Sequence, residues 1–367
     1  MLLLITFCVV FLVQFYFYLV LFRNYASFQR SEIEQKNYPI SVVVCAKNEA
    51  GNLERLLPKL AQQEYSAFEI VLVDDGSTDN TLNEMQSFKK AHSNSAFKVS
   101  IIQILQENSK GKKEALSMGI HKAQNQYILL TDADCMPVTE KWMSHMMSHF
   151  SQKTAIVLGY GAYQKINNSF LNKLIRFETL LTALQYFSYA LAGKPYMGVG
   201  RNLAYKKEAF IKAGGFKDHS HIRSGDDDLF VSQIANQNNT RICDDKESFT
   251  ESKPHNSFMN WIRQKRRHIT TAAHYKPETK ILLGLFFISQ IAIYGLLLIS
   301  VISETFRLVI ISLFLIRLLF WYITIHKVAM RLNEKDLIAF GPLYEISIIF
   351  IQLYIFLKNI ISPPKYW

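Results

Sequence analysis

The sequence predicts an α/β domain built on a mostly parallel sheet, with one transmembrane helix before it and about three after it. Two patterns lead to this fold class. Between residues 38 and 275, β-branched apolar runs alternate with helical patterns, which is typical of βαβ units and a parallel sheet. Toward both ends of the chain, charged residues become rare and the apolar runs become long enough to cross a bilayer.

Composition and charge narrow the class of protein further. Apolar residues make up 49% and aromatic residues 13% of the chain, which excludes a disordered protein. The net charge of +11 suits either nucleic acid or an anionic membrane surface as a partner. Because the apolar ends favour the membrane, we expect membrane lipids and no nucleic acid among the partners. Four cysteines without a CxxC pair argue against a disulfide scaffold and against a cysteine-rich zinc site.

The first apolar segment, residues 1–23, is predicted to be a transmembrane helix. Gln14 is its one strongly polar residue, and about 20 apolar residues are enough to cross the hydrocarbon core. A secretory signal peptide is the weaker alternative, because no basic residue precedes the segment and no small-residue cleavage site follows it. Arg23 ends the segment and Arg30 follows it, so its carboxyl end is expected in the cytoplasm.

Three further apolar segments, 281–303, 308–326 and 337–358, are also predicted to be transmembrane helices. A buried bundle in a soluble protein is the alternative, which three such segments in sequence make unattractive. The connection 326–336 is basic and comes to lie on the same side as the central domain, as the positive-inside rule requires. We therefore expect an integral protein of a bacterial inner membrane, with a cytoplasmic central domain.

Two charged residues interrupt these segments. Arg317 lies in the middle of its span, where a charged side chain costs about 2.5–3.5 kcal/mol. Such a cost predicts a partner, and Glu345 on the next segment is the candidate, with a lipid phosphate as the alternative. Gly341-Pro342 predicts a kink in that segment. A fifth long segment, 170–193, is too polar to span, so we expect an interfacial helix, with a core helix as the alternative.

Polar residues follow three of the strands predicted in the central region. The expected strands are 41–46, 69–73, 99–105 and 127–130, and the expected helices are 48–63, 78–90 and 114–123. The polar clusters are Lys47-Asn48-Glu49, Asp74-Asp75 and Asp132 with Asp134. Ligands of open α/β sheets bind at the carboxyl ends of the strands, so the convergence of these clusters predicts a site at that edge.

The pair Asp132 and Asp134 has the chemistry of a divalent cation site. In an extended chain, side chains at i and i+2 point the same way, and two adjacent carboxylates suit Mg²⁺ or Mn²⁺. An isolated Asp-x-Asp is more often a solvated turn, but its position after a buried strand favours the metal here.

Three other clusters each allow a functional and a structural interpretation. Asp74-Asp75 could bind a nucleobase or ribose, or belong to a turn capped by Ser77 or Thr78. Lys112, beside Gly111 at a predicted helix start, could contact a diphosphate or lie in a solvated turn. The acids at 226–228 could supply a general base, or could stabilise a helix N-terminus.

Together these segments resemble family 2 glycosyltransferases with the GT-A fold, in the membrane-anchored branch. The resemblance covers roughly residues 38–274. The matching segments occur in the family's order and read VVVCAKNEAGNL, VLVDDGSTDNT, SKGKKEALSMG, LLTDADC, GVGRNLAYKKEAF, SGDDDLF and QKRRH. Each motif alone is weak or moderate evidence for the family, whereas all of the motifs in this order form a pattern that is specific to it.

The resemblance implies a nucleotide-sugar donor, a divalent cation and an acceptor delivered by the membrane. It places the donor against Ala46, Asn48, Glu49, Asp74, Asp75 and Lys112. It places Mg²⁺ or Mn²⁺ on Asp132 and Asp134, between the protein and the diphosphate. The acceptor, lipid-linked or saccharide, and the diphosphate would lie near Gly200, Arg201, Asn202, Gln264, Arg267 and His268. Sugar transfer would proceed with inversion.

The resemblance also suggests which acid is the base. The family pattern Glu-Asp-x-Asp-Leu aligns without a gap so that Gly225 replaces the glutamate and Asp226 is the base. Asp227 is the alternative if the register slips by one. In the family's Gln-x-x-Arg-Trp motif, His268 replaces the tryptophan, so we expect transfer of one or few sugars, with a processive polysaccharide synthase as an alternative. A second alternative is an inert scaffold that keeps the fold, which the intact acids disfavour.

Overall fold

A computed structural model describes residues 1–30, 36–222, 224–303 and 306–363. The chain divides into two compact units. Residues 31–166 and 195–255 form what we call the α/β unit. Residues 1–30, 167–194 and 256–367 form what we call the helical unit. Each unit is described separately below, because the candidate chemistry and the apolar helices fall in different units.

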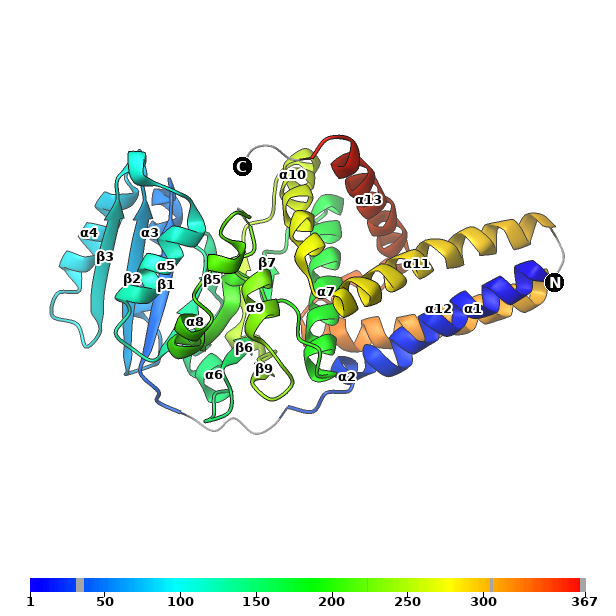
Figure 1. Ribbon diagram of the computed structural model, residues 1–367, viewed down its shortest axis with the longest axis horizontal. Helices are drawn as coiled ribbons and strands as arrows, with labels where there is room; N and C mark the ends of the chain where they lie inside the picture. The colour runs from blue at the N-terminus through cyan, green and yellow to red at the C-terminus, as the bar shows by residue number, and fades with distance from the viewer. Residues whose placement is uncertain (31–35, 223, 304–305, 364–367) are drawn as a thin grey trace. The chain divides into compact units, whose positions relative to one another are not determined.

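The α/β unit contains all the strands of the described chain and most of the short helices (Figure 1). Its strands are β1 (Ile40–Ala46), β2 (Phe68–Asp75), β3 (Lys98–Ile104), β4 (Tyr127–Leu130), β5 (Cys135–Pro137), β6 (Ile156–Leu158), β7 (Gly161–Tyr163), β8 (Leu203–Lys206), β9 (Thr240–Ile242) and β10 (Thr250–Ser252). Its helices are α3 (Ala50–Ala61), α4 (Thr81–Ala91), α5 (Lys112–Lys122), α6 (Trp142–Ser148), α8 (Lys207–Lys212) and α9 (Asp228–Ile234). Short 3₁₀ turns are η2 (Gln106–Asn108), η3 (Gly200–Asn202), η4 (Lys217–His219) and η5 (Lys246–Ser248).

The main sheet is mostly parallel, as predicted. Its seven strands follow the order β3-β2-β1-β4-β8-β6-β9, and β5-β10-β7 form a second, three-stranded sheet. Strands β1, β2, β3 and β4 run parallel, whereas β8 runs antiparallel to both β4 and β6. Parallel pairing puts the carboxyl ends of β1, β2 and β4 at one edge of the sheet, where the three polar clusters follow.

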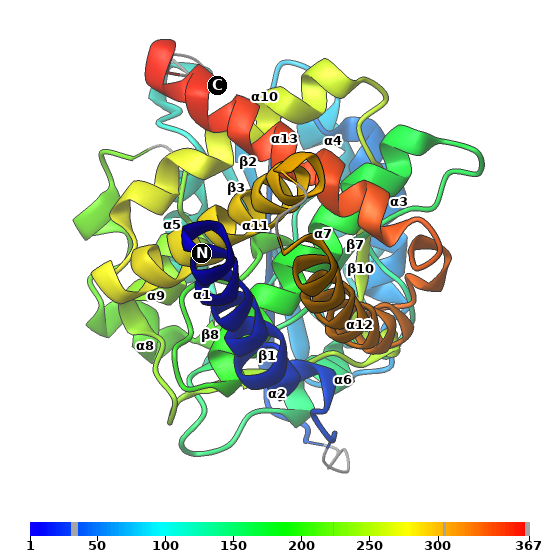
Figure 2. The same cartoon turned by 90° about the vertical axis from the view of Figure 1, so that its right-hand side faces the viewer.

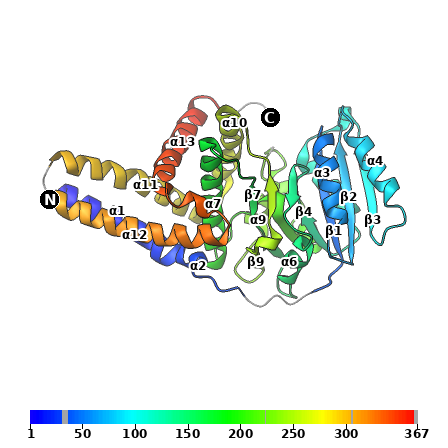
Figure 3. The same cartoon turned by 180° about the vertical axis from the view of Figure 1, so that it is seen from behind.

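Alternate residues of the central strands face different helices. Val42 and Val44 belong to a core cluster with the apolar side chains of α3 and α4, and Figure 3 shows these two helices beside each other on the sheet. Val73 faces the opposite way and packs with Ala115 of α5. Helix α3 continues through Pro58, within the predicted helix 48–63. Burial on both faces explains why these strands read as continuous apolar runs.

The helical unit contains four helices that are long and apolar enough to cross a membrane. The first, Leu2–Ala26, comprises α1 (Leu2–Tyr16), a π-helical turn η1 (Phe17–Leu21) and α2 (Arg23–Ala26); the others are α11 (Pro277–Ser303), α12 (Arg307–Arg331) and α13 (Gly341–Ile361). The unit also contains α7 (Phe170–Leu191), α10 (Phe258–Ile269) and the short turns η6 (Thr270–His274) and η7 (Lys335–Leu337). In Figure 2, α1 faces the viewer, with α11 and α12 beside it.

The predicted partnership between Arg317 and Glu345 is confirmed. Arg317 Nη2 lies 2.7 Å from Glu345 Oε1, and both side chains are 1% exposed. Gln14 of α1 accepts hydrogen bonds from Arg317 Nε at 3.1 Å and Nη2 at 3.0 Å. Tyr294 and Gln290 of α11 donate to Glu345 at 2.5 and 3.0 Å. The ion pair therefore links all four long helices through a closed set of hydrogen bonds.

Two other expectations for the helical unit concern the kink at Gly341-Pro342 and the environment of segment 170–193. The predicted kink at Gly341-Pro342 is wrong, because these residues begin α13, where proline fits the first turn without losing a helical hydrogen bond. Helix α7 buries more than half of its residues, among them Arg176, whose guanidinium pairs with Glu334 and Asp336. That burial favours the core-helix alternative for 170–193, and its interfacial placement stays a prediction.

Candidate active site

The loops that follow β1 and β2 are joined by hydrogen bonds at the carboxyl edge of the sheet. Asn48 has a left-handed backbone, with φ of 57°. Its backbone N–H donates to Ser77 Oγ at 3.0 Å, and its side-chain oxygen accepts from the N–H of Thr78 at 2.8 Å. The predicted capping role of Ser77 or Thr78 is wrong, because Asn80 precedes the helix and both residues are used to hold the Asn48 loop.

The acids at the end of β2 lie beneath this bridge. Asp74 pairs with Ala46 in the sheet register, and its Oδ1 accepts from the N–H of Ser77 at 3.2 Å. Asp75 is 5% exposed, and its Oδ1 is buried without a hydrogen-bond partner among the described residues. Gly76 allows the sharp turn after the acids, with φ of +70°. An unused buried acceptor costs about 1–3 kcal/mol, which points to a donor on a ligand.

Glu49 completes the cluster after β1. Its backbone N–H donates to Thr81 Oγ1 at 2.7 Å, and its carboxylate accepts from the side chain of Asn52. Burial raises the pKa of Glu49, and the nearby charges of Asp134 and Asp132 raise it further. Because the charges of Asp132 and Asp134 act on Glu49, the polar clusters after β1 and β4 lie close enough to interact electrostatically.

Lys112 is the cation at the centre of the site. Its Nζ lies 2.7 Å from Asp132 Oδ1 and 3.0 Å from Asp226 Oδ2. Burial favours the neutral amine, but the carboxylates outweigh it and raise the pKa of Lys112 well above its ordinary value. Its neighbours point elsewhere, since Lys110 pairs with Glu114, and Lys113 Nζ donates to backbone carbonyls at 219 and 222.

Asp132 and Asp134 converge through a turn rather than through an extended chain. The N–H of Cys135 donates to the carbonyl of Asp132 at 3.0 Å, which closes the turn. One oxygen each of Asp132 and Asp134 and the sulfur of Cys135 lie within 4.8 Å of one another. The predicted extended geometry is therefore wrong, although the two carboxylates still face a common point. Two carboxylate oxygens at this spacing suit a hard divalent cation.

The three acids at 226–228 have three different surroundings. Gly225, with φ of +93°, turns the chain into α9, and Asp228 begins that helix. Asp227 Oδ2 accepts from the N–H of Gly200 at 2.8 Å, and its Oδ1 accepts from the N–H of Asp228 at 2.8 Å. Asp226 instead faces Lys112.

These surroundings separate the acidities of Asp226 and Asp227. Burial raises the pKa of Asp226, but the ammonium of Lys112 outweighs it, so the pKa lies below its ordinary value. Burial and the charges of Asp226 and Asp228 raise the pKa of Asp227 to about 7. At neutral pH, Asp226 is thus a carboxylate, whereas Asp227 retains its proton more readily.

The segment Gly200–Asn202 lies beside Asp227. The side chain of its last residue, Asn202, is fixed by hydrogen bonds to other protein groups. Asn202 is 0% exposed, and its side chain accepts from Trp142 Nε1 at 3.0 Å and donates to the carbonyl of Ser248 at 2.8 Å. The guanidinium carbon of Arg201 lies 4.5 Å from the centre of the Tyr163 ring. This geometry suits Arg201 for ligand contact and Asn202 for positioning.

The remaining predicted residues belong to the helical unit. Gln264, Arg267 and His268 lie on α10, which is tied within that unit by Arg266 Nε donating to Asn359 Oδ1 at 2.8 Å. Gln264 Oε1 is buried without a hydrogen-bond partner among the described residues. Their participation in the site therefore stays a prediction.

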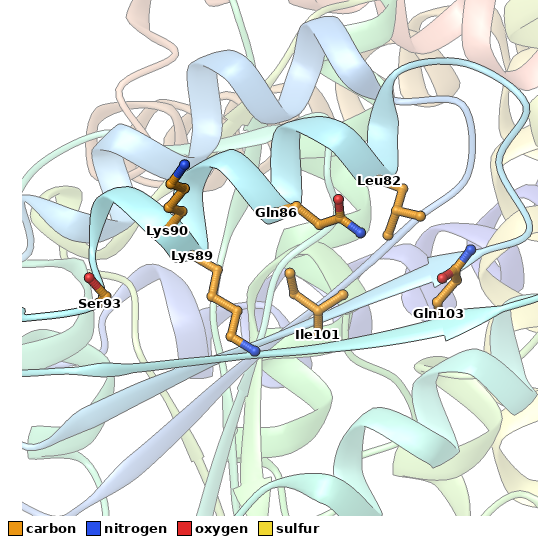
Figure 4. A pocket seen from close by; sticks show the side chains of 7 residues that line it. All are labelled: Leu82, Gln86, Lys89, Lys90, Ser93, Ile101 and Gln103. Atoms are coloured by element: carbon orange, nitrogen blue, oxygen red, sulfur yellow. The ribbon is translucent and has the colours of Figure 1, made fainter.

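Sequence reasoning missed several residues that shape the site. Trp142 and Tyr163 hold Asn202 and Arg201, and Lys113 fixes the segment that leads to the three acids. No local pattern marks them, because each acts over a long sequence separation. A hollow between α4 and β3, shown in Figure 4, includes no residue of the acidic cluster; it is lined by Leu82, Gln86, Lys89, Lys90, Ser93, Ile101 and Gln103.

Known proteins with similar sequences are glycosyltransferases. The family model for glycosyl transferase family 2 matches residues 41–214. A poly-β-1,6-N-acetyl-D-glucosamine synthase of Staphylococcus epidermidis is 28% identical over 197 residues, which cover 53% of this chain and 44% of the synthase. The glycosyltransferase GlyG of Streptococcus pneumoniae is 33% identical over 133 residues, which cover 36% of this chain and 42% of GlyG. The match thus spans less than half the length of these relatives.

A solved structure supports the fold assignment. The mannosyltransferase PcManGT of Pyrobaculum calidifontis, solved with GDP-Man and Mn²⁺, matches with a TM-score of 0.57 at 17% identity, covering 94% of this chain and 98% of that one. At this identity the likeness speaks for the fold alone. Residues 41–214 thus match glycosyltransferase family 2, and the chain has the GT-A fold together with helices long and apolar enough to cross a membrane.

Proposed function

We propose that this protein transfers a sugar from a nucleotide-sugar donor to a lipid-linked or membrane-delivered acceptor, with inversion and with a divalent cation, at the cytoplasmic face of the membrane. The observation that carries the proposal is the cluster around Lys112, which contacts Asp132 and Asp226 at the carboxyl edge of the sheet. A cation-binding pair of acids and a separate basic carboxylate are the two groups that such a transfer requires.

The nucleoside of the donor would lie against the bridged loops after β1 and β2. Asp75 offers a buried oxygen without a partner among the described residues, which suits the N–H of a nucleobase or a ribose hydroxyl. Asn48 is fixed by Ser77 and Thr78, so this side of the site is formed before the donor arrives. Lys112 is placed to contact the diphosphate.

Asp132 and Asp134 fit Mg²⁺ or Mn²⁺ and would hold it. When bound, the cation would act as a Lewis acid that neutralises the charge of the leaving nucleoside diphosphate. Lys112 already balances part of the negative charge of Asp132 and Asp226 before the cation and donor enter. The structure of PcManGT, which shares the fold, contains GDP-Man and Mn²⁺, so the fold can accommodate a donor and a cation of these classes.

Asp226 is our candidate for the general base. Its pKa lies below the ordinary value, so it is ionised and can take the proton of an acceptor hydroxyl as that oxygen attacks the anomeric carbon. Asp227 uses both oxygens for backbone N–H groups of Gly200 and Asp228, which suits a positioning role. Direct attack by one acceptor oxygen inverts the anomeric configuration, and no enzyme nucleophile is needed.

The acceptor is proposed to be lipid-linked and to receive one or few sugars. Basic residues after the first span and between the last two support a cytoplasmic α/β unit, by the positive-inside rule. His268 offers a smaller and more polar surface to a sugar ring than the tryptophan of polymer-making members. The relatives named as poly-β-1,6-N-acetyl-D-glucosamine synthases favour the alternative, a processive synthase.

One experiment tests the reaction and the product length together. The full chain, purified in detergent, is incubated with a panel of nucleotide sugars, Mn²⁺ and extracted bacterial lipid, and the products are resolved by mass. We expect one donor to be consumed, with one or few sugars added to a lipid. A ladder of many additions would establish the processive alternative. If the folded chain turned over none of the donors while a related glycosyltransferase was active on the same lipid, the proposed function would be rejected.

A further inference from the structure

A second cluster of metal-ligating side chains lies in the α/β unit, apart from the acids at the sheet edge. His149 follows the last turn of α6, and Cys243 and Asp245 follow β9. One ligand atom from each of these three residues lies within 4.8 Å of the other two. Cys243 is a free, fully buried thiol. The glycosyl transfer proposed above uses none of these residues.

A fourth side chain, that of His145, lies near the same carboxylate. His145 lies four residues before His149, so the helix places both imidazoles on one face. His145 Nδ1 and His149 Nε2 lie 3.8 and 3.7 Å from the same oxygen, Asp245 Oδ2. Both nitrogens are buried and have no hydrogen-bond partner in the part of the chain that the structure describes.

The distances suit a shared metal ion better than direct hydrogen bonds. A separation of 3.7–3.8 Å is longer than a hydrogen bond between nitrogen and oxygen. Tetrahedral ligands at about 2.0–2.2 Å from zinc lie roughly 3.3–3.5 Å from one another. A contraction of a few tenths of an ångström would therefore bring each imidazole to the separation from the Asp245 carboxylate that two ligands of one zinc ion have.

The surroundings of His145 favour the tautomer that a metal requires. Its other nitrogen, Nε2, lies 3.2 Å from Glu247 Oε2. A hydrogen on Nε2 facing this carboxylate leaves the lone pair of Nδ1 directed toward Asp245. A carboxylate that orients the outer nitrogen of a metal-bound histidine is a recurrent feature of zinc sites.

We propose that His145, His149, Cys243 and Asp245 form a structural zinc site. A thiolate, two imidazoles and one carboxylate are ligands that zinc accepts, and four protein ligands leave no open position. The site would join α6 to the connection between β9 and η5. Trp142 of α6 and Ser248 of η5, the turn that follows this connection, both hold Asn202, so the metal would brace the segment beside Asp227.

Zinc uptake by the metal-stripped full chain in detergent tests the proposal directly. In competition with a chromophoric chelator, we expect about one zinc per chain to bind and the Tm to rise by several degrees. Cobalt in place of zinc should give the near-ultraviolet charge-transfer band of a thiolate ligand. Wild-type protein that takes up no zinc would overturn the proposal.

A matched pair of cysteine variants distinguishes this cluster from the one at the sheet edge. Cys243→Ser should abolish the cobalt band, whereas Cys135→Ser, which removes the thiol beside Asp134, should keep it. The reverse result would move the site and overturn the proposal. If Cys243→Ser failed to fold, Glu247→Gln would decide, because loss of an outer carboxylate weakens zinc binding about 10–100-fold. Unchanged affinity in Glu247→Gln would contradict the geometry proposed for His145.

Discussion

Two charge clusters of this protein, one in each unit, are built on opposite principles. In the helical unit, Arg317 and Glu345 form a balanced pair whose hydrogen-bonding groups are met by side chains of the long helices. In the α/β unit, Lys112 faces both Asp132 and Asp226 with Asp227 also close by, and its own side chain is 44% exposed. The cluster of Arg317 and Glu345 is neutral and shielded from solvent, and we call it the closed cluster. The cluster around Lys112 carries excess negative charge and is exposed to solvent, and we call it the open cluster.

This difference separates a structural cluster from a functional one. In an apolar environment a charge persists only when a partner and hydrogen bonds compensate the loss of water. A surplus of carboxylates is unfavourable in the isolated protein, and a divalent cation or a proton relieves it. We therefore expect substitutions in the closed cluster to affect stability, and substitutions in the open cluster to affect ligand binding and turnover.

The largest expected effect is on the stability of the helical unit. Glu345→Gln leaves Arg317 without its counter-ion, and loss of one partner of a buried pair costs about 3–5 kcal/mol. The double variant Arg317→Leu with Glu345→Leu should recover most of this loss, because no unpaired charge remains. Unfolding in mixed micelles measures both effects. A double variant as unstable as Glu345→Gln would show that the pair is not the source of the stability.

Next in size is the effect of the proposed base on turnover. Asp226→Asn should lower kcat at least about 100-fold, the usual contribution of a general base, with the affinity for nucleotide nearly unchanged. The matched variant Asp227→Asn should retain more activity, because Asp227 is held by two backbone N–H groups. An inactive Asp227→Asn beside an active Asp226→Asn would reverse the assignment.

A smaller effect concerns the pH dependence of turnover. Lys112 keeps the pKa of Asp226 low, so Lys112→Met should raise that pKa. A base must be ionised to accept a proton, so the acid limb of the kcat profile should move to higher pH in the variant. The profile is measured at saturating donor, so that weaker diphosphate binding does not contribute. An unmoved limb would mean that Asp226 is not the group that titrates.

The smallest expected effect is on the pH dependence of stability. The pKa of Asp227 is raised to about 7, so the folded protein holds a proton that the unfolded chain has already released. Between about pH 4 and pH 7 this residue therefore lowers stability as the pH rises. Asp227→Asn should reduce the fall in Tm between about pH 5 and pH 8. An equal fall in both proteins would contradict the shifted pKa.

The sequence predicted most of the fold and the composition of the open cluster. Strand Tyr127–Leu130 and the pairing of Arg317 with Glu345 follow from apolar runs and from the cost of an unpaired charge, which are visible locally. The turn at Asp132–Cys135 and the start of α13 at Gly341 were predicted differently, because both depend on hydrogen bonds formed only after the chain folds.

Long-range contacts were beyond the reach of sequence reasoning. One motif contains Lys110, Lys112 and Lys113, and nothing in it indicates which lysine contacts Asp226. In the structure it is Lys112 that forms this ion pair. The division of roles between Asp226 and Asp227 depends on the N–H of Gly200, which is 27 residues away from Asp227 along the chain. The cluster of His149 with Cys243 likewise joins segments that no sequence motif connects.

Binding of Mn²⁺ to three versions of the full chain tests the central claim most directly. Electron paramagnetic resonance counts free Mn²⁺ in the presence of nucleoside diphosphate, and it needs no knowledge of sugar or acceptor. We predict that wild-type protein binds Mn²⁺, that Asp134→Asn loses this binding, and that Glu345→Gln, which alters the closed cluster, retains it while folded. Equal binding by wild type and Asp134→Asn would contradict the assignment of the open acidic cluster as the cation site.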